Sequence, residues 1–95
     1  MRLALYSSIA SAPLPNLIVV QNEDLLTLPP VLVCPLLGDT DLTSFRVAIE
    51  WETKRLVACP ELTRPIRRSG LHARGWLEEE QSQQVMDRLQ LLLAR

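Results

Sequence analysis

Four arginines and the only histidine of the chain stand within eleven residues, a grouping that could bind phosphate. A guanidinium can hydrogen-bond two oxygens of one phosphate, so such a segment can hold the backbone of a nucleic acid. A second interpretation is a solvated loop whose charge balances the three glutamates that follow it, residues 78–80. No Ser, Cys or pair of carboxylates lies near the histidine in a pattern that suggests a catalytic triad. The catalytic residues therefore stay unassigned. The grouped residues are Arg64, Arg67, Arg68, His72 and Arg74.

The end of the chain is a second candidate site, for binding a protein. Residues 77–95 contain neither Pro nor Gly, start with glutamates and end with arginine, which predicts a helix with charges that suit its dipole. Its apolar face would hold Leu77, Val85, Leu89 and Leu92. Three consecutive leucines are too apolar for a helix that buries only one face, so we expect them to contact a partner. The candidate partner-binding residues are Leu91, Leu92, Leu93 and Arg95.

Composition limits the classes of protein to consider. Ninety-five residues predict one domain, residues 1–95, and 10 basic against 11 acidic residues exclude a whole-chain attraction to nucleic acid. Four per cent aromatic residues leave an aliphatic core that a dimer would help to stabilise. Cys34 and Cys59 lack the spacing of a zinc site and predict two core thiols. We expect no metal, no cofactor and no membrane span, since no apolar run reaches about 18 residues, and a cytoplasmic location.

Hydrophobic patterning predicts a mainly β fold. The apolar runs 17–21 and 31–37 are typical of strands that are covered on both faces. Residues 44–51 alternate between apolar and polar, which predicts a half-buried strand followed by a hairpin turn and a fifth strand at 56–59. Arg2 to Ser7 suits a first strand. We expect residues 61–75 to form a loop with a short strand at 71–73.

Several short motifs resemble a known toxin superfamily. They are the strand end Leu5-Tyr6, the strand end Val20-Gln21, the Val-Cys-Pro-Leu sequence at 33–36 and the connector at 62–70 before the helix. In this order they are similar to the superfamily that contains CcdB-type gyrase poisons and MazF/PemK-type messenger-RNA endoribonucleases. The resemblance implies a small SH3-like barrel of about five antiparallel strands with a C-terminal α-helix, a homodimer, and a cognate antitoxin as partner.

The motifs that distinguish the two branches are missing. MazF-like nucleases need an arginine and a hydroxyl residue at positions that Pro15 and Leu37 occupy here, and CcdB-like poisons end in Trp-Gly-Ile, which this chain lacks. Because its N-terminal half resembles the CcdB branch, the leading hypothesis is a type II toxin that inhibits DNA gyrase by protein binding, without enzymatic activity. The alternatives are a MazF/PemK-like endoribonuclease that binds RNA through the arginine-rich segment, or an inactive relative that serves as an interaction module.

Overall fold

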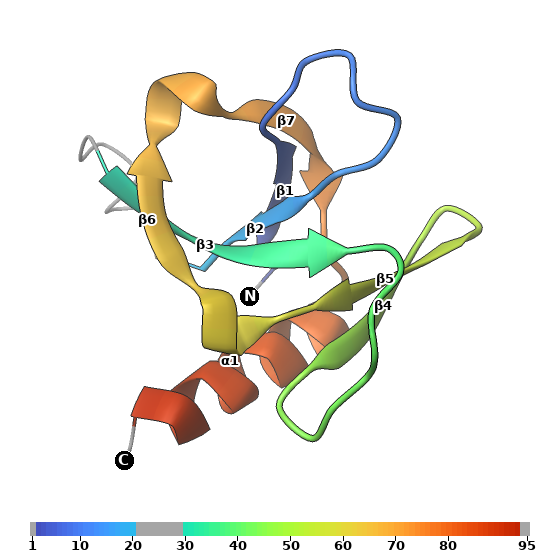
Figure 1. Ribbon diagram of the computed structural model, residues 1–95, viewed down its shortest axis with the longest axis vertical. Coiled ribbons are helices and arrows are strands. Elements are labelled where there is room, and N and C mark those ends of the chain that lie inside the picture. Colours follow the sequence, from blue (N-terminus) through green and yellow to red (C-terminus); the bar gives the residue numbers. More distant parts are fainter. Residues whose placement is uncertain (1, 21–29, 94–95) are drawn as a thin grey trace.

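Seven antiparallel strands and one helix make up the computed structural model, which describes residues 2–20 and 30–93 (Figure 1). Two short 3-10 turns, η2 (Pro60–Leu62) and η3 (Arg68–Gly70), flank the sixth strand. The helix is α1 (Glu79–Leu93). The strands are β1 (Ala4–Ser7), β2 (Leu17–Val19), β3 (Pro30–Leu37), β4 (Val47–Trp51), β5 (Lys54–Ala58), β6 (Arg64–Arg67) and β7 (His72–Trp76).

The strands form one sheet in the order β4-β5-β3-β2-β1-β7, with β6 also paired to β3, and the sheet curls into a half-barrel (Figure 1). Strand β3 is shared: one edge pairs with β2, while the other pairs first with β6 and then with β5. The change of partner falls at Pro35, which has no N–H to donate to a ladder. Its carbonyl instead accepts a hydrogen bond of 2.9 Å from Cys59 N.

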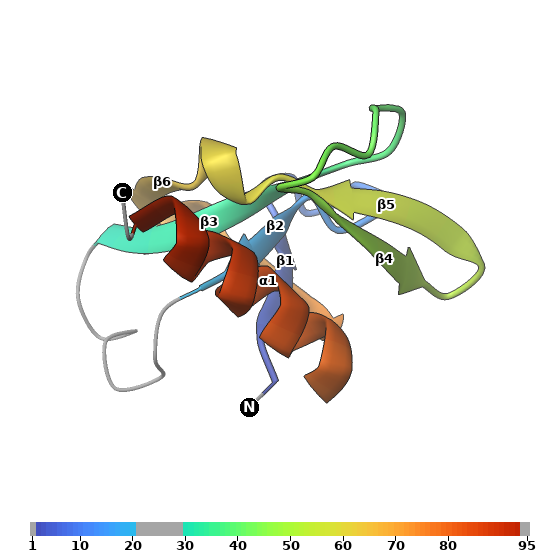
Figure 2. The ribbon, with the colours of Figure 1, turned by 90° about the horizontal axis from the view of Figure 1, so that it is seen from below.

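Both faces of β2 and β3 are covered, as their continuous apolar sequences predict. Ile18 and Cys34 face a larger core that includes residues of α1, while Val19 and Val33 face a smaller core inside the curl of the sheet. Figure 2 shows α1 lying across one face of the sheet. The smaller core is completed by Tyr6, Ile66 and Leu71, which are only partly buried.

The helix is fastened to the first strand by polar contacts as well as by packing. Ser82 is fully buried on α1, and its Oγ accepts a hydrogen bond of 2.9 Å from Leu3 N. Leu77 N donates to Leu3 O at 2.8 Å just before the helix starts. Val85 and Leu89 are buried behind these contacts. The predicted apolar face of the helix is therefore confirmed for Leu77, Val85 and Leu89, with Ser82 as an additional buried residue, while Leu92 is half-buried.

The sequence correctly predicts a mainly β fold with a C-terminal helix, but the number of strands is wrong. The segment 61–75, expected to be largely loop, contains all of β6 and the start of β7. The β4–β5 hairpin is confirmed, with a tight turn at Glu52 and Thr53. Cys34 and Cys59 are buried free thiols, also as expected. Among the described residues, no helix has the length and apolar character required to span a membrane.

Candidate nucleic-acid interface

Strand β6 and turn η3 place three arginines on the surface at one margin of the half-barrel. Arg64 pairs with Val33 of β3, and Arg67 pairs with Pro30, so β6 is held along the first half of β3. Turn η3 starts at Arg68 and leads into β7, whose first residue is His72. All four side chains are exposed. We call Arg64, Arg67, Arg68 and His72 the basic strip.

The charges of the basic strip are not used by the rest of the described fold. Within residues 2–20 and 30–93, none of its four side chains takes part in an ion pair or side-chain hydrogen bond. Strand β6 is held by backbone pairing to β3 and by Ile66, which packs against the smaller core. The guanidinium groups thus remain available to an anionic partner. Sequence analysis identified these residues, and the structure brings them to one connected surface segment.

Arg74, the fifth residue of the predicted group, has a different environment. It is the extra residue of a bulge in β7, because Leu5 pairs with Gly75 and Tyr6 pairs with Ala73. Its guanidinium donates to Pro13 O at 3.1 Å, to Ala12 O and, at 3.5 Å, to Ser7 Oγ. Its Cζ also lies 5.6 Å from the centroid of the Trp51 ring. Since these contacts hold the β1–β2 loop against the sheet, we leave Arg74 out of the basic strip.

A small cavity lies beside the basic strip, on the inner side of the sheet. Its volume is 130 Å³, and it is lined by Tyr6, Val19, Val31, Arg68 and Leu71. The two valines are buried, Tyr6 and Leu71 are half-buried, and Arg68 is exposed. The cavity therefore has apolar walls and a guanidinium at its rim. Sequence patterning did not reveal it, because its walls come from three strands and the segment 68–71, which are far apart in the chain.

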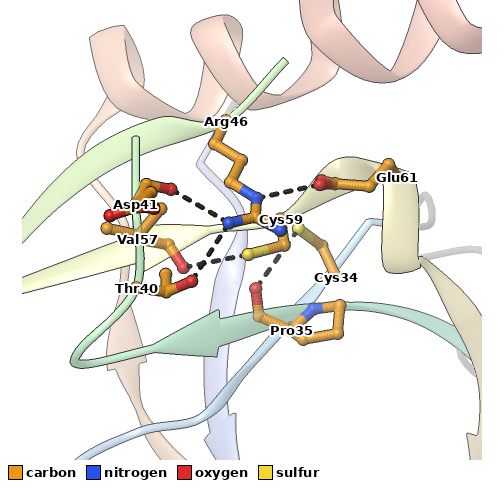
Figure 3. A network of polar contacts seen from close by, with 8 residues as sticks. All are labelled: Cys34, Pro35, Thr40, Asp41, Arg46, Val57, Cys59 and Glu61. Carbon is orange, nitrogen blue, oxygen red and sulfur yellow. Dashed lines mark hydrogen bonds and ion pairs between the residues drawn. The ribbon is translucent and has the colours of Figure 1, made fainter. Parts of the chain in front are cut away.

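A cluster of polar contacts around Arg46 closes the loop between β3 and β4 (Figure 3). Nε of Arg46 donates to Glu61 Oε2 at 2.8 Å, and its Nη1 donates to Thr40 Oγ1 at 3.0 Å and to Asp41 O at 2.9 Å. The hydrogen bond that Arg46 donates to the Glu61 carboxylate raises the pKa of Arg46. Because Nη1 holds two atoms of the loop while Nε holds Glu61 of η2, this arginine serves to fix the loop.

Two buried thiols lie behind this loop. Cys34 Sγ is 3.7 Å from Pro35 O, and Cys59 Sγ is 3.7 Å from Val57 O (Figure 3). Burial raises the pKa of Cys34 to about 12 and also raises that of Cys59. A thiol in this state is a poor nucleophile, because the thiolate is the reactive form. The cysteines are therefore core residues.

The positions that the family resemblance assigns to nuclease chemistry carry no catalytic group. Pro15 is buried, and Leu37, at the end of β3, is 40% exposed. The nearest hydroxyl along the chain is that of Thr40, which accepts the hydrogen bond from Arg46. Any cleavage chemistry must therefore use other side chains.

The candidate partner-binding residues at the helix end are accessible. Leu91 and Leu93 are 56% and 75% exposed, and Leu92 is half-buried. Beside them lies a groove of 330 Å³, lined by Leu32, Pro60, Glu61, Thr63, Leu89, Leu92 and Leu93. Arg95 lies outside the described residues. The structure thus leaves apolar surface at this end of α1, as the run of leucines predicts.

Comparison with solved structures finds the same fold in a toxin. The chain superposes on the Mycobacterium tuberculosis toxin MazF-mt6 with a TM-score of 0.75, covering 99% of this chain and 97% of that one at 14% sequence identity. At this identity the likeness establishes the fold alone. No protein-family model matches the sequence, and no curated protein matches it.

Proposed function

We propose that this protein is the toxin of a toxin–antitoxin pair and acts on single-stranded RNA through the basic strip. The observation that carries this proposal is the full-length likeness to a MazF toxin, whose fold matches 99% of the chain. The unpaired arginines of β6 and η3 supply the phosphate contacts that RNA binding needs. This likeness favours our MazF-like hypothesis over the CcdB-like gyrase inhibitor, which was the leading hypothesis from sequence.

Recognition of a single strand fits the charge pattern better than recognition of a duplex. The basic strip is short, and the net charge of the chain is −1, so the surrounding surface does not attract a long polyanion. A strip of this kind follows the backbone of one strand, with affinity that falls as salt rises. Binding at low millimolar salt and release at several hundred millimolar are therefore expected.

The chemistry that we propose is attack of a ribose 2′-oxygen on its own 3′-phosphate. The new P–O bond makes a 2′,3′-cyclic phosphate, and the bond to the 5′-oxygen of the next nucleotide breaks. A base must accept the 2′-hydroxyl proton, and an acid must protonate the leaving 5′-oxygen. In this proposal His72 accepts the 2′-hydroxyl proton and then donates a proton to the leaving 5′-oxygen. Arg68 stabilises the negative charge that develops on the phosphate.

Cleavage and binding of a mixed-sequence RNA test this proposal. We expect Arg67→Ala and Arg68→Ala each to weaken binding and to lower the slope of log affinity against log salt by about 1. We expect His72→Ala to keep binding and to lose cleavage, and an all-deoxy oligonucleotide to stay uncut. Arg55→Ala is the matched control, since Arg55 is an exposed arginine of the β4–β5 hairpin.

The outcomes separate two forms of the proposal, a toxin that cleaves RNA and a relative that only binds RNA. Binding without any cut supports an RNA-binding relative, which the buried Pro15 and the exposed Leu37 at the expected catalytic positions favour. Absence of RNA binding at low salt rejects both forms. Cuts that persist in the His72→Ala variant would assign the proton transfer to another group.

Two partners complete the proposal. The exposed leucines of α1 are suited to a second copy of the chain, giving a homodimer. An acidic antitoxin segment that folds on binding would suit the basic strip and compete with RNA there. Co-expression with a neighbouring acidic open reading frame, followed by an RNA-binding measurement, tests this competition.

A further inference from the structure

We propose that the cavity beside the basic strip binds one unpaired pyrimidine base, with Arg68 at its rim contacting the adjoining phosphate. This inference deepens the proposed function and rests on it, because the base would belong to the RNA held by the basic strip. The cavity is lined by Tyr6, Val19, Val31, Leu71 and Arg68. We call it the base cavity.

The size of the base cavity matches a single six-membered ring. Its volume is 130 Å³, and an engineered apolar cavity of about 150 Å³ is known to bind benzene. Pockets for drug-sized ligands start at roughly 300 Å³, so a whole nucleotide does not fit inside. A pyrimidine ring can enter while its ribose and phosphate stay outside. The two fused rings of a purine are larger than the single ring that a cavity of about 150 Å³ holds, so a purine should fit less well.

The lining has the chemistry of a stacking site. Val19 and Val31 form a buried apolar floor, and the half-buried ring of Tyr6 and the side chain of Leu71 form walls. Aromatic side chains stack on bases in sequence-tolerant single-strand binding. Among the described residues of the lining, Arg68 alone carries a charge. Its side chain makes no ion pair with a described residue, so it is available to a phosphate.

Other small occupants fit this lining less well. Water needs two to four polar partners to stay in a cavity, and the walls here are mostly aliphatic. A free phosphate would meet one guanidinium and four uncharged side chains, which cannot replace its hydration. An aromatic side chain of a protein partner would match the walls, but it would not use the guanidinium groups of Arg68 and its neighbour Arg67. The adjoining positive charge therefore favours a nucleic acid.

Methyl NMR with mononucleotides measures binding of a single base in the base cavity. It does so separately from binding of an RNA chain by the basic strip. With valine and leucine methyl groups labelled, uridine or cytidine 5′-monophosphate at millimolar concentration should shift the resonances of Val19, Val31 and Leu71. Those of Val57, which lies outside the lining, should not move. Adenosine 5′-monophosphate should cause smaller shifts.

Substitutions in the walls of the base cavity provide a second test of base binding. Leu71→Phe fills the base cavity and should abolish the shifts of Val19 and Val31, whereas Leu62→Phe, at an exposed leucine of η2, should leave them unchanged. Tyr6→Phe keeps the ring and should keep binding. Tyr6→Leu removes the ring and should weaken binding of an oligouridine at least about fivefold, the low end of one stacked base.

The results distinguish failure of the base cavity from failure of the RNA proposal. If oligouridine and an abasic oligonucleotide of equal length bind equally, and no methyl group moves with uridine monophosphate, the base cavity is rejected while RNA binding by the strip stands. If mononucleotides shift the methyl groups but no RNA is bound or cut, the base cavity stands and the RNA-toxin proposal fails. Stronger shifts with adenosine than with uridine would overturn the pyrimidine assignment.

Discussion

Arg46 and Glu61, fifteen residues apart, form a charged hydrogen bond of 2.8 Å between Nε and Oε2 that ties the loop after β3 to η2. The same guanidinium holds Thr40 and the carbonyl of Asp41, so three contacts of the loop depend on one side chain. An arginine can do this because its donors form a rigid, planar fork. The loop between two strands is thereby held by the polar contacts of one side chain.

The first prediction concerns this loop. We expect Arg46→Ala to lower the urea midpoint of unfolding and to speed proteolytic cleavage within residues 38–46, because all three contacts are lost together. Glu61→Gln should have a smaller effect, since the amide can still accept a hydrogen bond. Arg55→Ala, at an exposed site, should change neither measurement. Equal cleavage rates for Arg46→Ala and the unmodified protein would contradict the role assigned to Arg46.

The second prediction concerns the bulge of β7. Gly75 has a φ of +133°, a conformation that residues with a Cβ rarely adopt, although nothing lies within 4 Å of the position a Cβ would take. Gly75→Ala should therefore cost about 1–3 kcal/mol of stability through backbone strain alone. Gly38→Ala is the control, because that glycine has equal space and no positive φ. Similar melting temperatures for the two variants would show that the strain is absent.

The third prediction concerns pH. The folded-state pKa of Cys34 is raised by burial from 9.0 to about 12. The unfolded chain therefore loses this thiol proton first, so the stabilisation is complete below pH 9 and is lost as pH rises toward 12. The slope should approach about 1.4 kcal/mol per pH unit. Urea midpoints between pH 8 and 11 should fall less steeply for Cys34→Ala than for the unmodified protein. Parallel pH profiles would exclude this linkage.

The fourth prediction concerns self-association through α1. Sedimentation at tens of micromolar, roughly the range in which obligate dimers stay assembled, should show a dimer. Leu93→Asp should give a monomer, because a charge at the contact cannot be buried without a partner. Leu93 is 75% exposed in the single chain, so this change should leave the melting temperature of the monomer nearly unchanged. Gln90→Asp, also exposed on α1, is the control and should remain dimeric.

The parts of the fold that the sequence predicts are those with a strong hydrophobic period. Val47 and Ile49 alternate with exposed residues in β4, and Val85 and Leu89 mark the inner face of α1. Strands β6 and β7 carry little such signal. Their residues are exposed or half-buried, and they include Pro65 and Gly75, which usually break strands. Pairing with β3 and β1 makes these segments strands, and that pairing is tertiary information.

The candidate site divides in the same way. The arginines of the basic strip are close in sequence, so their grouping is visible before folding. The base cavity joins Tyr6 to Leu71 and Val19 to Val31 across several strands, so no local pattern contains it. Arg74 belongs to the group in sequence, but it lies in a bulge beside Gly75 and its guanidinium contacts the β1–β2 loop. Strand register and bulges depend on contacts across the whole sheet. The pattern of neighbouring residues in the sequence therefore does not predict them.

The hydrogen bond from Leu3 N to Ser82 Oγ joins residues 79 positions apart, and it has a consequence for synthesis of the protein. Strand β1 leaves the ribosome well before β7 and α1, which cover its edge and the face that carries Leu5. Contacts so distant in sequence close late and make folding slow. Translation that stops before residue 72 leaves the apolar side chains of β1 and β2 uncovered. Such a nascent chain is expected to be a substrate for chaperones and proteases until residues 72–93 have been made.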